Sequence, residues 1–168
     1  KGGGNCASVG NTLSSRQRGN GAFAFWPGSQ DSDDNISIYA MHFLLEAQQQ
    51  QLAVSESVMQ RGFDYLRQIA AQNQGGYRAE TIAYAIYVLT RSGVVTTNYL
   101  PQLQTTLEKS APKTWKHSQA AMWMAASYQQ LKLDQLANEL IAGYEFATPT
   151  MQYEWYLDSA LVRNAQNL

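Results

Sequence analysis

The chain has 168 residues and a formal net charge of −1; 45% of its residues are hydrophobic and only 15% are charged. This length predicts a single domain with room for a sizeable core. The 12 Lys and Arg residues are scattered along the chain. The sequence therefore argues against a nucleic-acid-binding protein, because affinity for phosphates needs clustered cations. No apolar run approaches the roughly 20 residues of a membrane span, so we expect no direct insertion of this segment into a membrane.

Cysteine and histidine are scarce. The single cysteine, Cys6, excludes an internal disulfide and a cysteine-based metal site. The two histidines, His42 and His117, are too far apart in the sequence to suggest a histidine-rich site. We therefore expect no metal and no cofactor. The chain begins at Lys1 without a signal peptide, and we expect it to be an internal fragment or a processed product of a larger protein.

Residues 1–22 are predicted to be a glycine-rich flexible segment and loop, and residues 23–168 a helical domain. From Ile36 onward, apolar residues recur at helical spacing and predict about seven helices with no strand. The breaks fall at Gly75-Gly76, at Gly93 and at Pro112, and Thr148-Pro149 precedes the last helix. The predicted buried positions, helix by helix, are Ile36, Tyr39, Ala40, Phe43, Leu44 and Ala47; Val58, Tyr65, Leu66 and Ile69; Ile82, Ala83, Ile86 and Leu89; Leu100, Leu103 and Leu107; Ala121, Met124, Ala125 and Tyr128; Leu136, Ala137, Leu140, Ile141 and Tyr144; and Tyr153, Tyr156, Leu157, Ala160 and Leu161.

An internal repeat supports an all-α architecture. The segment YAMHFL at residues 39–44 returns as YAIYVL at residues 84–89, a spacing of 45 residues. Each copy opens a pair of helices and follows a loop that contains glycine and an aromatic residue. A repeated helical hairpin whose neighbours complete its core predicts a helical array or a closed α/α toroid.

Three segments, in order, resemble a known family. Residues 17–29 (QRGNGAFAFWPGS) are similar to the Q-x-x-x-G-G-F-x-x-W loop of bacterial alpha-2-macroglobulin-like proteins. Residues 38–47 (IYAMHFLLEA) are similar to that family's T-A-Y-A-x-D-F-L-L-E-A helix, and residues 84–91 (YAIYVLTR) to its A-Y-A-L-Y-V-L-A-R helix. The resemblance covers roughly residues 15 to 145.

The resemblance implies the C-terminal part of a thioester domain, an α/α toroid of which this chain would supply a partial ring. Members of the family are protease traps of the bacterial periplasm, usually lipid-anchored to the inner membrane. A protease cleaves a bait region, and a Cys–Gln thioester then captures it. The implied partners are proteases, through the parent protein, and neighbouring domains of the same parent.

Cys6 departs from the family pattern. The reactive motif is Cys-x-Glu-Gln, whereas Cys6 lies in the sequence NCASV and lacks both the Glu and the Gln. In this sequence context, Cys6 cannot form the internal thioester. Either the motif lies in a missing N-terminal part, or this member lacks it. No Lys, Arg or His nearby would lower the pKa of the thiol, so an incidental cysteine is the simpler interpretation.

The alternative hypothesis is an α/α-toroid enzyme. Asp31, Asp33 and Asp34 fit the D-x-D-D pattern of terpene cyclases, in which a protonated carboxyl donates a proton to an alkene or epoxide. Carboxylates before a helix also cap its free amides, and we prefer that interpretation. Such a cyclase would also need a second helical domain, which 168 residues cannot hold.

A sugar-active toroid would instead use acid–base groups at its mouth, for which Glu80, Tyr84, His117 and Glu154 are candidates. His42 is expected to be a structural or surface histidine, and His117 a solvated one. The aromatic loop of Phe23, Phe25 and Trp26 is expected to anchor helices within the toroid. The preferred interpretation is a domain without enzymatic activity.

Overall fold

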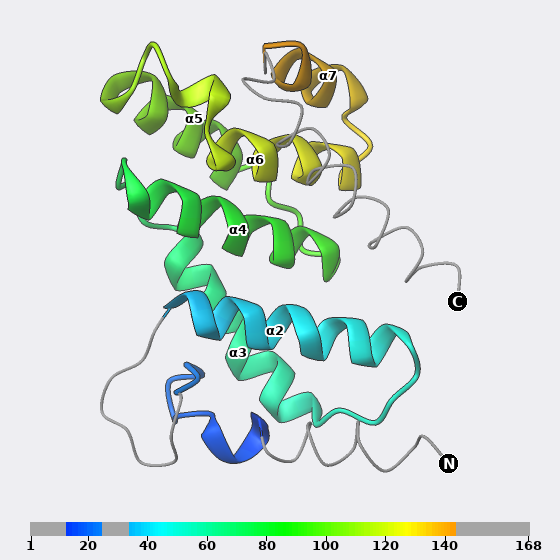
Figure 1. Ribbon diagram of the computed structural model, residues 1–168. Coiled ribbons are helices and arrows are strands. Elements are labelled where there is room, and N and C mark those ends of the chain that lie inside the picture. Colours follow the sequence, from blue (N-terminus) through cyan, green and yellow to red (C-terminus); the bar gives the residue numbers. More distant parts are fainter. Residues whose placement is uncertain (1–12, 25–33, 144–168) are drawn as a thin grey trace.

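The computed structural model describes residues 13–24 and 34–143. Residues 13–16 form a single helical turn, and no strand occurs in these two described ranges. One isolated antiparallel bridge joins Gln17 to Phe23. The labelled elements, in chain order (Figure 1), are α2 (Asp34–Gln49), α3 (Glu56–Ala70), α4 (Tyr77–Arg91), α5 (Tyr99–Ser110), the 3-10 turn η1 (Trp115–His117), α6 (Gln119–Gln130) and α7 (Asp134–Gly143).

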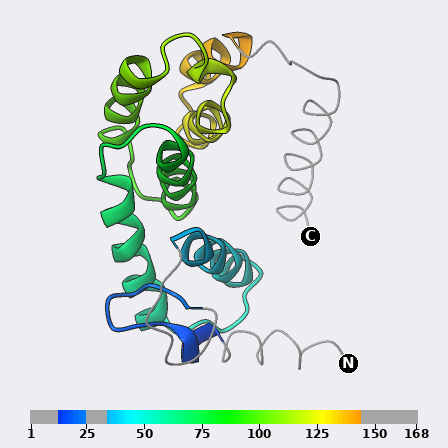
Figure 2. The ribbon, with the colours of Figure 1, turned by 60° about the vertical axis from the view of Figure 1, so that its left-hand side comes forward.

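The helices form successive hairpins arranged in two layers. Helices α2, α4 and α6 follow one another in one layer, and α3, α5 and α7 cover them. Figure 2 shows α2 and α4 nearly end-on, one above the other, with α3 running beside both. Helix α4 lies at the centre and contacts α2, α3, α5 and α6. This all-α architecture of stacked hairpins is the one expected from the sequence.

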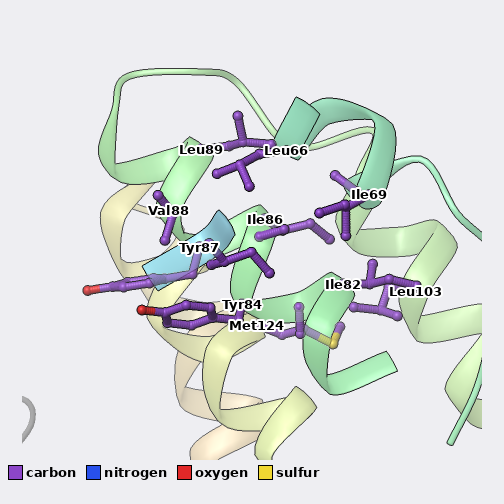
Figure 3. Packing of buried hydrophobic residues seen from close by; sticks show 14 of the residues in the cluster. Leu66, Ile69, Ile82, Tyr84, Ile86, Tyr87, Val88, Leu89, Leu103 and Met124 are labelled. Atoms are coloured by element: carbon purple, nitrogen blue, oxygen red, sulfur yellow. The ribbon is translucent and has the colours of Figure 1, made fainter. Parts of the chain in front are cut away.

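The central position of α4 explains its composition. Every residue from Ile82 to Arg91 is buried, because neighbours cover the helix on all sides. Figure 3 shows Ile82 directed toward Leu103, and the rings of Tyr84 and Tyr87 extending together to another side of the helix. The helix ends at Arg91, and Gly93 follows with a φ of +97°, a conformation that favours glycine. The predicted buried face and the predicted glycine stop of this helix are therefore confirmed.

The 45-residue repeat places its two copies side by side. Asp34 pairs with Arg78 near the starts of α2 and α4, and Glu46 pairs with Arg91 near their ends. Between these ends, the repeat-equivalent Tyr39 and Tyr84 have ring centroids 5.5 Å apart. The two helices are therefore parallel neighbours, displaced by one repeat.

The buried face of α2 differs from the prediction. The predicted stripe contained Tyr39 and Phe43, which are 67% and 44% exposed. Ala40 and Leu44 of the predicted stripe are buried, and the helix also buries Ser37, Ile38, Met41 and Leu45. Ile36 and Ala47 are half-buried. Both stripes of α2 are apolar, so periodicity could not decide between them. The contact with α3 selects the stripe that contains Met41, because Gly62 offers a side-chain-free surface there: a Cβ on Gly62 would lie 2.0 Å from Met41 Sδ.

Helix α3 begins after Ser55, whose side chain accepts a hydrogen bond from the Val58 amide, as an N-cap residue does. Its buried residues include Val58, Leu66 and Ile69 as predicted, whereas Tyr65 is only half-buried. Tyr65 instead uses its hydroxyl to donate a hydrogen bond to Asp34 of α2.

Helices α5 and α6 bury the predicted residues. Leu100, Leu103 and Leu107 are at most 3% exposed. On α6 the four predicted positions, Ala121 to Tyr128, are at most 6% exposed. In α7, Ala137 and Leu140 are buried as predicted, but Leu136 is 42% exposed. The prediction for Leu136 is wrong because α6 covers only one side of α7. Tyr144 and the predicted seventh helix (Tyr153 to Leu161) lie outside the described residues.

The segment 17–24 packs against α2 and α3. Phe23 is 1% exposed, and its amide donates a hydrogen bond to Ser37 Oγ at 2.9 Å. Gln17 Nε2 donates to the Val58 carbonyl at 2.9 Å. Gly21 has a φ of +92° and lies against the Arg61 carbonyl, where a Cβ would be only 2.0 Å away. Phe23 is thus buried beneath α2; Phe25 and Trp26 lie outside the described residues.

Candidate functional site

A polar and aromatic group lies where α2, α4 and α6 meet. We call it the junction cluster and define it by seven residues. These are Tyr39, His42 and Glu46 of α2, Tyr84, Tyr87 and Arg91 of α4, and Trp123 of α6.

The rings of the junction cluster form a continuous series of contacts. Tyr84 and Tyr87 lie 4.3 Å and 4.9 Å from Trp123 between ring centroids. The His42 ring meets the same two tyrosines edge-on, at 5.7 Å and 6.0 Å. Tilted and edge-on arrangements are those that aromatic quadrupoles favour. The rings therefore tie three successive helices of one layer together.

Arg91 is the charged centre of the junction cluster. Its side chain is only 1% exposed, and it forms a close ion pair with Glu46. Its other terminal nitrogen donates to Gln49 Oε1 at 3.1 Å. A buried guanidinium needs such partners, because an unpaired buried charge is strongly destabilising. His42 lies beside the pair, with Nε2 3.2 Å from Arg91 Nη1 and 3.6 Å from Glu46 Oε1.

The opposite ends of α2 and α4 carry a second polar junction. The Asp34 carboxylate accepts a short hydrogen bond from the Tyr65 hydroxyl and pairs with Arg78 at 2.6 Å. Next to it, Thr81 Oγ1 donates to Asn35 Oδ1 at 3.2 Å. Asp34 thus connects the first turns of α2 and α4 to the middle of α3.

The remaining candidate residues from the sequence are distributed over the chain. Asp31 and Asp33 lie outside the described residues, so their role stays a prediction, and the same holds for Cys6 and Glu154. Glu80 lies in the first turn of α4, and His117 lies on the exposed side of η1. Tyr84, by contrast, belongs to the junction cluster and lies 2.6 Å from His42 Nδ1.

The ion pair between Arg91 and Glu46 was not predicted from the sequence. One signal was present: the 45-residue repeat aligns Glu46 with Arg91, an acid with a base. Parallel neighbours displaced by one repeat bring aligned positions together, so this pair could have been predicted from the spacing. Within residues 13–24 and 34–143, no group of three or more His, Cys, Asp or Glu is arranged to hold a metal ion. In the same ranges, no helix combines the length and hydrophobicity that crossing a membrane requires.

The two-layered stack of helical hairpins, tied along one layer by the junction cluster, is the architecture of an α/α-toroid domain. Comparisons with known proteins agree with this class. No family model matches the chain. Over 159 residues, which are 94% of the chain, it is 33% identical to the alpha-2-macroglobulin of Rickettsia conorii. Over 77% of the chain it is 35% identical to the alpha-2-macroglobulin homolog of Yersinia pestis.

Solved structures give the same result for the fold. The crystal structure of trypsin-activated alpha-2-macroglobulin from Escherichia coli matches 82% of this chain with a TM-score of 0.68 and 21% identity. The cryo-EM reconstruction of the native conformation of that protein matches 82% of the chain with a TM-score of 0.64 and 23% identity. The chain belongs to the bacterial alpha-2-macroglobulin family. It spans only 8% and 6% of the two curated relatives named above.

Proposed function

We propose that this chain is part of the helical thioester domain of an alpha-2-macroglobulin-like protease inhibitor, with a structural role and no catalytic one. The observation that carries the proposal is the 33% identity to an alpha-2-macroglobulin over 94% of the chain. In this proposal the helices support and shield a thioester that other parts of the parent protein supply, because Cys6 lacks the Cys-x-Glu-Gln motif. The parent would act in the periplasm, attached to the inner membrane by a lipid.

The similarity to two conformational states supports a role as a rigid unit. The chain matches the native and the trypsin-activated Escherichia coli structures almost equally well, with TM-scores of 0.64 and 0.68. A trap that rearranges on proteolysis would move such a unit as a rigid body about its interfaces. The junction cluster and the Asp34–Arg78 pair favour this behaviour, since they tie the first two hairpins together at both ends.

The outer face of α2 supports packing against neighbouring parts of the parent. Tyr39 and Phe43, one turn apart on α2, are 67% and 44% exposed. Adjacent exposed aromatic side chains are typical of surfaces that another protein part covers. In the proposed function, further helices or domains of the same parent pack against this face. This packing would keep water from the thioester until the bait is cut.

The test uses the full-length gene product that contains this chain. The product is mixed with a broad-specificity protease and run on a denaturing gel. The proposal expects bands heavier than the intact product, and prior treatment with methylamine, which opens thioesters, should abolish them. A matched control uses the same protease with its active site blocked, which cannot cut the bait and should give no adduct.

Two outcomes of the gel experiment count against the proposal. Adducts that persist after methylamine treatment would mean that the capture does not use a thioester. Cleavage without any adduct, with the protease still free to digest large substrates, would mean that the protein is not a trap at all. Recovery of the product in the cytoplasmic fraction of cells would contradict the proposed location independently of the gel.

A further inference from the structure

The connection between α5 and α6 concentrates positive charge on one short turn. Four of the five lysines of the chain lie between residues 109 and 132, and no Asp or Glu interrupts this stretch. Two of them, Lys113 and Lys116, lie in the connection itself, on either side of Trp115. We call residues 111–118 the lysine turn. The cations of the chain as a whole are scattered, so this turn is a local exception.

The lysine turn is held in place by its backbone and by Trp115. The amides of residues 114, 117 and 118 each donate to the carbonyl three residues earlier, at 3.0–3.1 Å. In turns of this kind, side chains three residues apart lie on the same side, so Lys113 and Lys116 point in a common direction. Trp115 is 2% exposed, and η1 packs against α6 and α7. Lys116 Nζ lies 5.9 Å from the centroid of the Trp115 ring, which also restricts this lysine.

The charges of these two lysines are not neutralised by the described residues. Both side chains are exposed. Within residues 13–24 and 34–143, every ion pair uses His or Arg as its cation, and none uses a lysine. Helix α6 begins directly after the turn and has no acidic residue in its first turn, so the partial positive charge of its N-terminus adds to that of the lysines.

Lys109 is different, because its position has a local explanation. It lies in the last turn of α5, where a cation interacts favourably with the negative end of the helix. Lys113 and Lys116 lie outside the α-helices and have no such role. These two residues therefore carry the argument.

The size and chemistry of the lysine turn favour an acidic protein segment as its partner. Nucleic-acid binding needs an extended row of phosphate contacts, which two lysines do not supply. Segments that lie on a membrane combine cations with inserted apolar side chains, whereas Trp115 is buried. A few carboxylates on a peptide, by contrast, match two exposed ammonium groups on one side of a turn.

We propose that the lysine turn is a docking surface for an acidic segment of a protein, whose carboxylates pair with Lys113 and Lys116. The ordered backbone and the buried Trp115 place the two ammonium groups before the partner arrives, which lowers the entropic cost of binding. The proposal concerns the surface of this chain alone and does not rest on the proposed function.

The experiment measures binding of a fluorescein-labelled decaglutamate peptide to the full chain by fluorescence anisotropy, at neutral pH and low salt. The key variant is the double substitution Lys113→Gln with Lys116→Gln. The matched control is Arg61→Gln with Lys132→Gln, which removes the same charge from two exposed positions outside the turn.

We expect the Kd of the key variant to be about tenfold higher than that of the wild type, a difference of about 1.4 kcal/mol. Half of this difference for each lysine is within the range measured for exposed ion pairs. The Kd of the control should stay within about twofold of the wild type, and binding should weaken at about 150 mM salt, because salt screens exposed charges.

Three outcomes would overturn the proposal. The wild type would fail to bind the peptide at low salt, or the two double variants would have equal Kd values, which would show an effect of net charge alone. In the third outcome, the wild type would bind duplex DNA or phosphatidylglycerol vesicles more tightly than the peptide, and the key variant would lose that binding.

A second measurement needs no variant. Backbone amide chemical shifts of the ¹⁵N-labelled wild-type chain are recorded while the same peptide is added. We expect the changes to concentrate in residues 109–118. Changes centred on another part of the chain would contradict the proposed docking surface.

Discussion

Gly62→Ala tests how tightly α2 and α3 are packed. Gly62 is buried where α3 meets α2, and a Cβ there would lie 2.0 Å from Met41 Sδ and 2.7 Å from its Cε. Favourable contacts between such atoms are about 3.5–4.0 Å long, so the end of Met41 would have to move by about 1.5 Å. Met41 is 0% exposed. The displaced side chain therefore has no solvent to move into.

Two opposing effects set the size of the loss. Alanine is favoured over glycine in a helix interior by about 1 kcal/mol. Overpacking a close-packed core costs about 1–3 kcal/mol, and the displacement required here places this site at the upper end. We therefore expect Gly62→Ala to lower the free energy of unfolding by about 2 kcal/mol.

Urea unfolding measures this loss, and two comparisons isolate its cause. Gln68 is exposed on the same helix, so the pair Gln68→Gly and Gln68→Ala gives the helix propensity term alone. The double variant Met41→Ala with Gly62→Ala removes the obstructing side chain. It should be more stable than the sum of the two single losses predicts. Unchanged or increased stability of Gly62→Ala would refute the reasoning, and so would simple additivity in the double variant.

Three further predictions concern the polar groups. Arg91→Ala should lower the free energy of unfolding by about 2–3 kcal/mol in urea, because it leaves the partly buried Glu46 carboxylate without its cation. A free energy of unfolding within about 1 kcal/mol of the wild type would contradict this. A double-mutant cycle with Asp34→Asn and Arg78→Ala should give a coupling energy of about 1 kcal/mol. The coupling should weaken in 1 M salt, since both side chains are partly exposed. A coupling energy of zero would contradict a stabilising ion pair between Asp34 and Arg78. Burial raises the pKa of the Tyr128 hydroxyl, so the unfolded chain releases this proton first and stability falls as the pH rises through about 10. Tyr128→Phe should therefore lose less stability than the wild type between pH 9 and pH 11, and equal losses would show that Tyr128 does not contribute.

The sequence predicted the fold best where a helix had only one way to pack. The buried residues of α5 follow a single apolar stripe, Leu100, Leu103 and Leu107, and the prediction was confirmed. Helix α4 is covered on all sides, so any apolar stripe assigned to it is buried. Helix α2 is different because it carries two apolar stripes, and its contact with α3 at Gly62 favours the stripe that contains Met41.

The polar contacts were harder to predict, because they join residues that are far apart in the chain. Arg91 could be recognised as a last-turn cation from the sequence, but its partners belong to another helix 42 to 49 residues earlier. The repeat contained this information once the two helices were known to be parallel. Asp34 was expected near a helix start and lies in the first turn of α2. Its contact with Tyr65 depends on the angle at which α3 crosses α2, which sequence periodicity does not report.

The parallel arrangement of α2 and α4 has an electrostatic consequence. Helices that point the same way bring their positive N-terminal ends together at one edge and their negative C-terminal ends together at the other. Asp34 supplies a negative charge at the start of α2, and Arg91 supplies a positive charge at the end of α4. Each charge thus opposes the partial charges gathered at its own edge. Asp34 and Arg91 are the members of the two ion pairs whose sign is favourable at these edges, and they therefore offset part of the cost of pointing α2 and α4 in the same direction.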